Sequence, residues 1–283
     1  MNVFILHAHP EPHSLNGALT ALAVETLTAA GHAVEVSDLY AMNWKAAADG
    51  DDFLDRRDAT RLNYARESGH AFASGSQSAE VAAEQAKLLR ADAVILQFPL
   101  WWFSMPAILK GWFDRVYAYG FAYGVGPHEG ERWGDRYGEG SLLGRRALVS
   151  VTVGGREPHY SPRGVNGDID DVLFPIQHGM LFYPGMAVLE PFVVYQANHL
   201  SPERWAEEAE RYRARLAGLF TDPAIPYRRQ NGGHYDTRQV LKPGLGEGES
   251  GARLHRIRPG DPPEAPLPEA WDHPTRRASG TTA

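Results

Sequence analysis

Three loops of this sequence carry residue types that bind ligands rather than fill a core. The first loop, residues 7–16, reads His-Ala-His-Pro-Glu-Pro-His-Ser-Leu-Asn and leads into an amphipathic helical pattern. A helix N-terminus presents free backbone N–H groups and the positive end of the helix dipole, which together suit a phosphate. Ser14 and Asn16 either add donors to such a site or only cap the helix. His7 and His9 have no third ligand nearby, so no metal site is expected.

The second loop opens an aromatic region. Residues 98–123 hold ten of the 30 aromatic side chains, and Trp101, Trp102 and Phe103 stand consecutively after an apolar run. Core packing explains three adjacent aromatic residues at a strand end poorly, because such loops normally face water. The triplet indicates either a wall for a flat ligand or an interface between subunits.

The third loop follows the apolar run 147–153 and begins with Gly154 and Gly155. Paired glycines let the backbone approach a ligand closely, although the same pair also occurs in a plain turn. Tyr160 and Asn166, a few residues further on, add a hydroxyl and an amide. Three such loops in one chain indicate a binding site more strongly than any one of them alone.

Composition limits the chemistry that these loops can perform. The 283 residues are 43% hydrophobic and 22% charged, which is ordinary for a globular protein. The net charge of −7 argues against nucleic acid as a partner. The chain has no cysteine, which excludes disulfide scaffolds, thiolate metal sites, Fe–S clusters and cysteine nucleophiles. Neither a membrane span nor a signal peptide is indicated, so we expect a cytoplasmic protein.

Alternating strand and helix patterns must position the loops. Strands are expected at 3–6, 33–36, 93–98, 147–153 and 186–195. Helices are expected at 15–30, 80–90, 106–116, 168–183 and 201–220, with a long connection over 40–80 that holds perhaps one more. This alternation predicts a doubly wound parallel α/β sheet. In such a sheet, ligands bind beyond the carboxyl ends of the strands, where all three loops would lie.

The chain changes character after about residue 240. Residues 243–283 contain seven prolines and six glycines and show almost no periodicity. Such a segment buries too little apolar surface to offset its ordering entropy. We therefore expect a domain over 1–240 and an irregular tail, 241–283, that is disordered or serves as an arm over a neighbouring subunit.

Several stretches of the chain resemble the NAD(P)H:quinone oxidoreductases of the DT-diaphorase type, which have a flavodoxin-like fold. The matching stretches are 14–16, 37–43, 97–103, 106–113, the Thr-x-Gly-Gly of the third loop, and 189–191. The resemblance covers roughly residues 1–220. It implies a five-stranded parallel sheet in the order 2-1-3-4-5, and a homodimer with its active site at the interface.

The resemblance also implies roles for individual residues. The phosphates and ribityl chain of FAD, or of FMN, would be held by His9, Ser14, Leu15 and Asn16. The flavin ring would be flanked by Pro99, Leu100, Trp102, Phe103, Thr152, Gly154, Gly155 and Tyr160, and the adenosine half by Asp114. NAD(P)H and quinone would share a pocket walled by Trp101, Phe121, Tyr123 and Asn166. The Gly155 N–H and the Tyr160 hydroxyl would be the catalytic groups, donating hydrogen bonds near flavin N1.

The sequence departs from the family pattern at three of these places. Asn166 stands where the family has the histidine partner of the tyrosine, so a proton relay through an imidazole is absent. His13 and Val125 stand where the family has a phosphate-side threonine and a second pocket tyrosine. An arginine that binds adenosine would lie near Arg204.

These observations predict a flavin-dependent NAD(P)H oxidoreductase that reduces quinones or related electrophiles by two-electron, ping-pong hydride transfer. No clamp for a 2′-phosphate can be placed, so NADH and NADPH are not distinguished. The alternative is a flavoprotein regulatory subunit of a membrane ion-efflux system, which resembles these reductases. A flavodoxin-like electron carrier fits less well, because such carriers are small and lack an aromatic-walled pocket.

Overall fold

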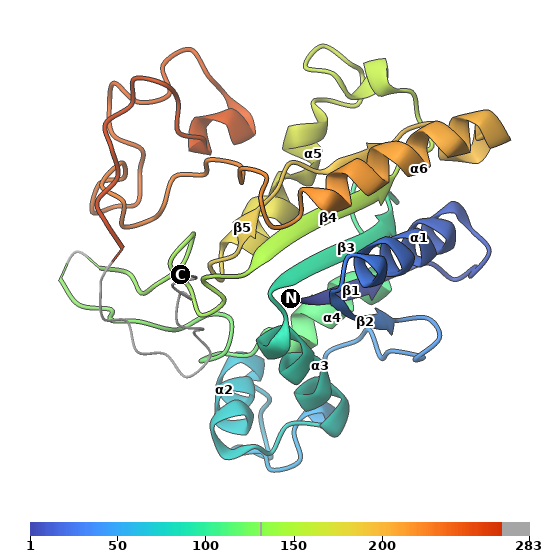
Figure 1. Cartoon of the computed structure of the whole chain (residues 1–283). Coiled ribbons are helices and arrows are strands. Elements are labelled where there is room, and N and C mark those ends of the chain that lie inside the picture. The colour runs from blue at the N-terminus through green and yellow to red at the C-terminus, as the bar shows by residue number, and fades with distance from the viewer. Residues whose placement is uncertain (131, 268–283) are drawn as a thin grey trace.

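A parallel sheet forms the centre of the molecule, because each apolar run is followed by a segment long enough to return the chain to the same sheet edge. The computed structural model describes residues 1–130 and 132–267. Its strands lie in the order β2-β1-β3-β4-β5, with β6 also paired to β4, and every pair is parallel (Figure 1). The predicted order is therefore confirmed. The strands are β1 (Asn2–His7), β2 (Ala33–Asp38), β3 (Ala93–Pro99), β4 (Arg146–Thr152), β5 (Ala187–Val188) and β6 (Phe192–Val194).

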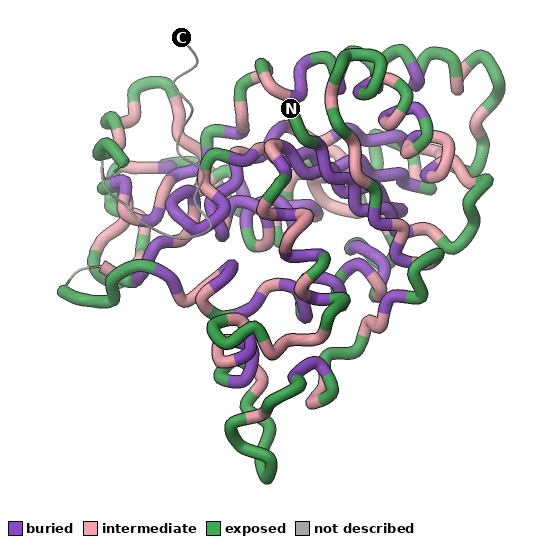
Figure 2. The backbone as a smooth tube through the Cα atoms, turned by 60° about the horizontal axis from the view of Figure 1, so that its bottom comes forward, coloured by how far each residue is buried: buried purple, intermediate pink, exposed green. Residues whose placement is uncertain are grey.

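Helices cover both faces of the sheet, as the doubly wound pattern requires. Strand β1 shows why: Val3 and Ile5 pack into the layer under α1 and α6, while Phe4 and Leu6 pack into the layer under α3, α4 and α5. Figure 2 shows the buried backbone running through the middle of the molecule between these layers. The helices are α1 (Leu15–Ala29), α2 (Tyr64–Ser74), α3 (Ala79–Arg90), α4 (Ala107–Val116), α5 (Ile169–Ile176) and α6 (Pro202–Ala217).

Two predicted elements differ in detail. The single strand expected over 186–195 is split, because Pro191 has no N–H for the ladder and separates β5 from β6. The two pieces pair with opposite ends of β4. The helix expected over 168–183 ends its α-helical part at Ile176 and continues as the wider π-helical turn Gln177–Phe182.

The long connection between β2 and α3 contains one α-helix, α2, and the short 3₁₀ turn Gly50–Asp52. A buried ion pair joins this connection to the rest of the fold. The Arg115 guanidinium on α4 lies 2.7 Å from the Asp52 carboxylate, and both side chains are almost wholly buried. Arg115 also pairs with Glu80 in the first turn of α3. The connection is thus held by charge pairing together with apolar side chains such as Trp44, which is buried in the main core.

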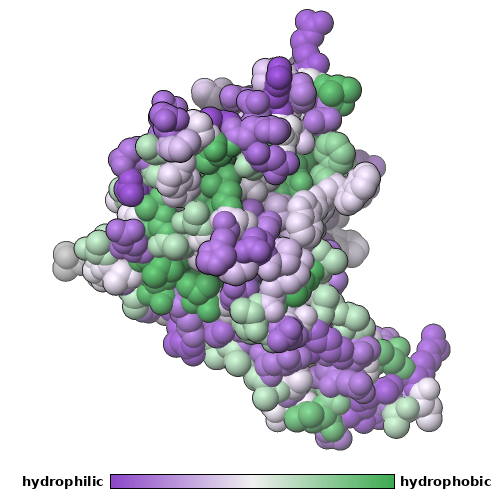
Figure 3. Space-filling view, turned by 90° about the vertical axis from the view of Figure 1, so that its right-hand side faces the viewer, coloured by the Kyte–Doolittle hydropathy of each residue, from purple (hydrophilic) through white to green (hydrophobic). Residues whose placement is uncertain are grey.

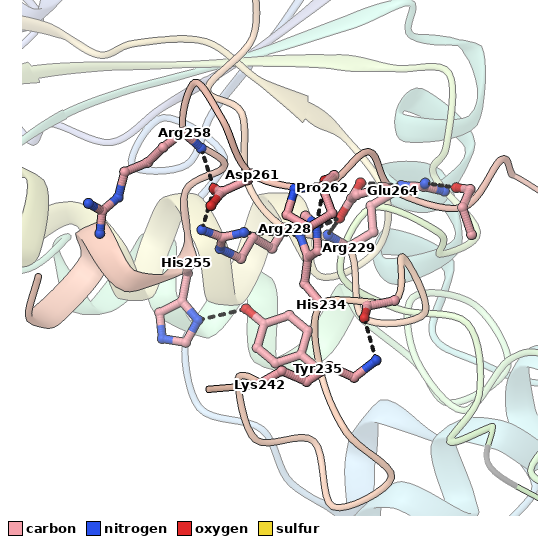
Figure 4. Close-up of polar contacts among 12 residues, drawn as sticks. Arg228, Arg229, His234, Tyr235, Lys242, His255, Arg258, Asp261, Pro262 and Glu264 are labelled. Carbon is pink, nitrogen blue, oxygen red and sulfur yellow. Dashed lines mark hydrogen bonds and ion pairs between the residues drawn. The ribbon is translucent and has the colours of Figure 1, made fainter. Parts of the chain in front are cut away.

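The described part of the tail, residues 241–267, is irregular apart from the short 3₁₀ helix Gly251–His255. Arg228, just before the tail, anchors it. The fully buried Arg228 side chain donates to the Leu254 carbonyl at 3.1 Å. It also donates to the Asp261 carboxylate at 2.7 Å (Figure 4). Arg229 beside it pairs with Glu264 at 2.8 Å.

A second contact joins the tail to the start of α5. The Arg253 guanidinium lies 2.6 Å from the carboxylate of Asp168, which is the N-cap of α5. The backbone N–H of Ala252 donates to Asp171 at 2.7 Å. Because Asp168 ends the third ligand loop, the tail braces the segment that carries Tyr160 and Asn166.

Of the two states expected for the tail, the disordered one does not describe residues 241–267. Arginine–carboxylate pairs and hydrogen bonds to backbone carbonyls order this segment. The fraction of apolar residues in a segment does not predict such interactions. An arm over a neighbouring subunit stays a prediction. The rest of the expected tail, 268–283, lies outside the described residues.

Replacing Asp261 by Asn keeps the shape of the anchor but removes the counter-charge of the buried Arg228. A buried charge that loses its partner is costly, so we expect the free energy of unfolding to fall by about 1–3 kcal/mol. Asp236→Asn removes the partner of the exposed Arg238 and should change it by less than about 0.5 kcal/mol. Urea denaturation of both variants at pH 7 measures the difference.

The same pair has a pH signature. The backbone N–H of Arg258 and the Arg228 guanidinium hold the pKa of Asp261 below its usual value. The stabilisation is therefore fully present above the unfolded-state pKa of about 3.9, and it is lost as the pH falls through the lower folded-state pKa. The deficit of Asp261→Asn should shrink over that acid range. A deficit that is constant with pH would contradict this assignment.

Candidate active site

The three ligand loops meet at the carboxyl end of the sheet, where one buried side chain ties them together. Asn16, on the first turn of α1, accepts a hydrogen bond from Gln97 of β3 at 2.8 Å. Its own amide nitrogen donates to the Thr152 hydroxyl of β4 at 2.9 Å. All three residues are buried. The backbone N–H of Leu100 adds a third bond, to the Thr152 carbonyl at 2.8 Å. We call Gln97, Asn16 and Thr152 the bracket.

The aromatic triplet forms a strained turn. Trp101 and Ser104 exchange two backbone hydrogen bonds, of 2.9 and 3.0 Å, and enclose Trp102 and Phe103. Both enclosed residues have positive φ, +50° and +61°. Such a turn normally holds Asn and Gly, since bulky side chains are costly in the left-handed region. The Trp102 side chain is 95% exposed, so core packing does not repay this strain.

Strain of this kind persists where the surrounding structure enforces it, and it occurs mostly at functional sites. The strands of the sheet point toward the side of the molecule that Figure 3 faces, where apolar groups gather among polar ones. The His9 ring from the first loop stands 6.1 Å from the ring of Trp101. The turn therefore presents a flat aromatic surface beside the first loop.

The first loop lies close over the start of α1. The Ser14 side chain accepts from the Gly17 N–H at 3.2 Å and so caps the helix. A Cβ on Gly17 would lie 1.9 Å from the Pro12 carbonyl oxygen, so only glycine allows this approach. The cap uses the third N–H of the helix. Leu15 and Asn16 supply the first two, and these are the groups that can bind an anion.

The third loop sets a tyrosine against a glycine backbone. The Tyr160 ring lies so close to Gly155 that a Cβ there would stand 2.9 Å from it. Tyr195 flanks the other side, with ring centroids 5.9 Å apart. Burial raises the pKa of Tyr195 to about 12, so it stays neutral. Gly154 is exposed, and a Cβ added there would meet only the Asn198 amide nitrogen among the described residues, at 3.5 Å, so its surroundings are open to a ligand.

Helix α4 separates the remaining predicted residues from this cluster. It runs for ten residues, about 15 Å, away from the aromatic turn. Asp114 lies in its last turn, exposed and paired with Lys110 at 2.5 Å. Tyr123 follows the helix and packs edge-on against Tyr119 at 5.5 Å. The structure therefore does not bring Asp114 or Tyr123 to the aromatic turn of the same subunit.

Phe121 belongs to the core. Its side chain has no exposed surface and packs against Phe72 at 5.3 Å. A side chain without exposed surface does not wall an open pocket of the subunit, so its predicted role is replaced by a structural one. Val125, where the family has a tyrosine, is also buried.

The other predicted positions lie around the cluster. Pro99 is buried at the end of β3 and Leu100 is half-buried. Asn166 is half-buried, and its backbone N–H donates to the His159 carbonyl at 3.0 Å, which closes the loop that carries Tyr160. Arg204 donates to the Tyr195 carbonyl at 2.6 Å. His13 stays exposed next to the cap.

Sequence reasoning missed Gln97 as a member of the site, although a signal was present. Gln97 is the one polar residue in the otherwise apolar run 93–99. A polar side chain in a wholly buried strand needs a partner, and this one lies at the ligand end of the strand. His7 at the end of β1 is similar: burial lowers its pKa, and Thr20 is its partner at 2.8 Å.

The arrangement fits a flavin. A flat, exposed aromatic turn held under strain suits an isoalloxazine, the open N–H groups of α1 suit a phosphate, and the open backbone of Gly154 suits close approach of a ring edge. These features come from three loops that the bracket holds together.

Comparison with known proteins agrees with this geometry. A family model described as a flavodoxin-like fold matches residues 1–216. The chain belongs to this family. It is 53% identical over 258 residues to a ribosyldihydronicotinamide dehydrogenase-like protein, traD, of Penicillium crustosum, covering 90% of this chain and 95% of that protein. It is 41% identical over 222 residues to NAD(P)H dehydrogenase (quinone) 1 of Rattus norvegicus, covering 78% of each.

A crystal structure of a candidate quinone reductase from Klebsiella pneumoniae is also similar. It is 55% identical, superposes with a TM-score of 0.88, and covers 91% of this chain and 100% of that one. Within the flavodoxin-like fold, the chain thus belongs to the NAD(P)H quinone oxidoreductases and is an oxidoreductase. The family implies a flavin cofactor and NAD(P)H. These relatives give no support to the ion-efflux alternative.

The likeness to the Penicillium crustosum protein extends into the tail. An alignment over 90% of the chain must include part of the tail, since residues 1–240 make up less than that share.

In the part of the chain that the structure describes, no helix is both long and apolar enough to cross a membrane.

Asn16→Ala tests the bracket. It leaves the Gln97 amide and the Thr152 hydroxyl buried without this partner, so the free energy of unfolding should fall by about 1–3 kcal/mol. Thr28→Ala, at an exposed position of the same helix, should change it by less than about 0.5 kcal/mol. Thermal melts provide the measurement. Equal shifts for the two variants would show that the bracket does not stabilise the fold.

A second prediction concerns the strained turn. Phe103→Gly and Phe103→Ala both remove the ring, but only glycine relieves the positive φ. We expect the Gly variant to be more stable than the Ala variant by about 1 kcal/mol. Thermal melts of the pair measure the strain directly. An Ala variant as stable as the Gly variant would mean that the turn is relaxed.

Proposed function

We propose that this protein is an FAD-dependent enzyme that reduces quinones or related electrophiles with electrons from NAD(P)H. The observation that carries the proposal is the strained aromatic turn, placed between the N-terminus of α1 and the Gly154–Gly155 backbone in a chain of this family. FAD rather than FMN is proposed because the resemblance extends to Asp114 on the adenosine side.

The residues divide into three groups of contacts. His9, Ser14, Leu15 and Asn16 would hold the phosphates and ribityl chain at the start of α1. The ring would lie among Pro99, Leu100, Trp102, Phe103, Thr152, Gly154, Gly155 and Tyr160. Trp101 and Asn166 would border the slot for nicotinamide and quinone, together with Tyr123 from the partner subunit.

When bound, the flavin supplies two-electron chemistry, accepting a hydride from NAD(P)H and passing it to the acceptor. The chain supplies orientation and charge stabilisation. The Gly155 N–H and the Tyr160 hydroxyl donate hydrogen bonds where reduction places negative charge, and donors fixed in advance cost no reorganisation at that moment. The Trp101–Phe103 turn excludes water from one side of the ring. Because donor and acceptor use one slot in turn, the kinetics are ping-pong.

A homodimer with the active site at the interface is part of the proposal. The Trp102 side chain is exposed in one subunit, and α4 keeps Tyr123 and Asp114 of that subunit away from it. A second copy would cover the exposed aromatic turn and bring these residues to it. We also propose a cytoplasmic location, which is the expectation from the composition.

The spectrum of the purified protein and the identity of its released flavin test the proposal. One FAD per chain is the expected result. FMN in its place would overturn the choice of cofactor but leave a flavoenzyme. A colourless protein that takes up neither flavin on titration would overturn the function itself.

Tyr160→Phe tests the catalytic hydroxyl. One such donor is worth about 2–4 kcal/mol at most, so flavin reduction by NAD(P)H should slow by roughly ten- to a hundredfold. The flavin content should not change, because the ring of Tyr160 and its contact with Gly155 remain. Stopped-flow measurement of the reductive half-reaction decides. An unchanged rate with normal flavin content would leave the hydroxyl without a catalytic role.

Asn166→Ala is the companion variant. An amide does not titrate near neutral pH, so Asn166 holds the loop or the substrate but relays no proton. We expect a smaller loss of rate than in Tyr160→Phe. In the native protein, the pH profile of flavin reduction should show no step near the pKa of an imidazole. Asn166→His should introduce such a step. A step already present in the native chain and lost in Asn166→Ala would contradict this assignment.

A further inference from the structure

A separate cavity of about 280 Å³ lies between the tail and the domain. It is enclosed by the loop after α4, the π-helical turn and the tail. The lining residues that matter here are Arg136, Tyr137, His178, Arg228, Tyr235 and His255. None of them belongs to the three ligand loops, and the activity proposed above uses none of them.

Aromatic rings form flat walls on two sides of this cavity. Tyr137 stacks on His178 with ring centroids 4.7 Å apart and an angle of 27°. His255 stacks on Tyr235 at 6.2 Å and 21°. Phe174 joins the two pairs, at 4.5 Å from His178 and 5.4 Å from His255. The rings are close to parallel within each pair, and the two walls meet where His178 and His255 lie 5.4 Å apart at an angle of 42°. The cavity is thus lined by flat ring surfaces that converge at this contact.

Two arginines give the cavity a positive charge. Arg228 is wholly buried and pairs with Asp261, and its guanidinium also contacts His234 at 3.0 Å (Figure 4). The Arg136 Nε donates to the Gln230 side chain, and no carboxylate among the described residues pairs with Arg136. The lining contains no Asp or Glu from the described residues. Among the described residues, the Arg136 guanidinium is thus left without a carboxylate partner.

The two histidines add neutral hydrogen-bonding groups. Burial lowers the pKa of His178 to about 3, and burial together with Arg228 lowers the pKa of His255. The His178 side chain is only 9% exposed, and its Nε2 has no partner among the described residues. The His255 Nδ1 and the Tyr235 hydroxyl bond to each other at 2.8 Å (Figure 4). A buried polar group without a partner is costly unless a ligand satisfies it.

We propose that this cavity is a second ligand site, which binds a small planar anion of the aromatic monocarboxylate class. The ring of the guest lies against the aromatic walls, and its carboxylate pairs with the Arg136 guanidinium. The volume is near the lower limit of about 300 Å³ for ligand pockets, which restricts the guest to a single ring. Tyr235 of the domain and His255 of the tail close the site, so an occupied cavity also ties the tail to the domain.

Benzoate is the probe, added to the purified protein with its native cofactor content and measured by titration calorimetry. We expect saturable binding of benzoate, with benzamide and cyclohexanecarboxylate at least about tenfold weaker, because one lacks the charge and the other the flat ring. Equal affinity for all three compounds would overturn the assignment of ligand class.

Variants test whether benzoate binds in this cavity. Arg136→Gln should weaken benzoate by roughly tenfold or more, and Arg136→Lys should restore part of it. Arg238→Gln is the matched control, since it removes an exposed charge from the same region outside the cavity and should leave binding unchanged. Unchanged melting temperatures exclude misfolding. Benzoate binding that survives Arg136→Gln but is lost in Trp102→Ala would overturn the proposal, because it would place benzoate at the aromatic turn.

Discussion

The hydrogen-bonded bracket of Gln97, Asn16 and Thr152 is the constraint on which the candidate site depends. It joins a helix start to the ends of two neighbouring strands, and the backbone bond from Leu100 to Thr152 links the same strand ends. Three loops that are distant in sequence are thereby held in register by one buried amide. An amide serves here because its oxygen accepts and its nitrogen donates, whereas an ionised carboxylate can only accept. The positions of the three ligand loops beyond the bracket depend on it.

The aromatic turn shows what this fixed frame allows. Trp102 and Phe103 adopt a backbone conformation that bulky residues avoid, and their side chains face away from the core. Two backbone bonds between Trp101 and Ser104 close the turn, and the strand before it is buried along its whole length. The rigid strand end can therefore hold a strained backbone. The strain lowers the stability of the fold, but it fixes the position of the aromatic surface formed by Trp102 and Phe103.

Much of the fold was predictable from the sequence because its signals are local. Apolar runs such as 93–98 and helix patterns such as 80–90 gave the sheet and its layers, and the family resemblance gave the strand order. The split at Pro191 has a local signal as well, because proline lacks the N–H that a continuous strand needs there. The ordered tail was not predictable, because the partners of Arg228 lie up to 33 residues away along the chain and no periodic pattern marks them. The positions of Asp114 and Tyr123 relative to the aromatic turn likewise follow from the direction of α4, which composition does not reveal.

The way in which the tail is attached has a consequence for how the molecule comes apart. Its outer contacts, such as Arg253 with Asp168, are solvent-exposed ion pairs, whereas Arg228 is sealed from water. Added electrolyte screens the first kind and hardly reaches the second. At high ionic strength the tail would loosen from its outer contacts inward while the sheet stays intact, as a separate cooperative unit of low local stability. Amide hydrogen exchange in this segment would then depend on ionic strength far more steeply than exchange in β1 or β3.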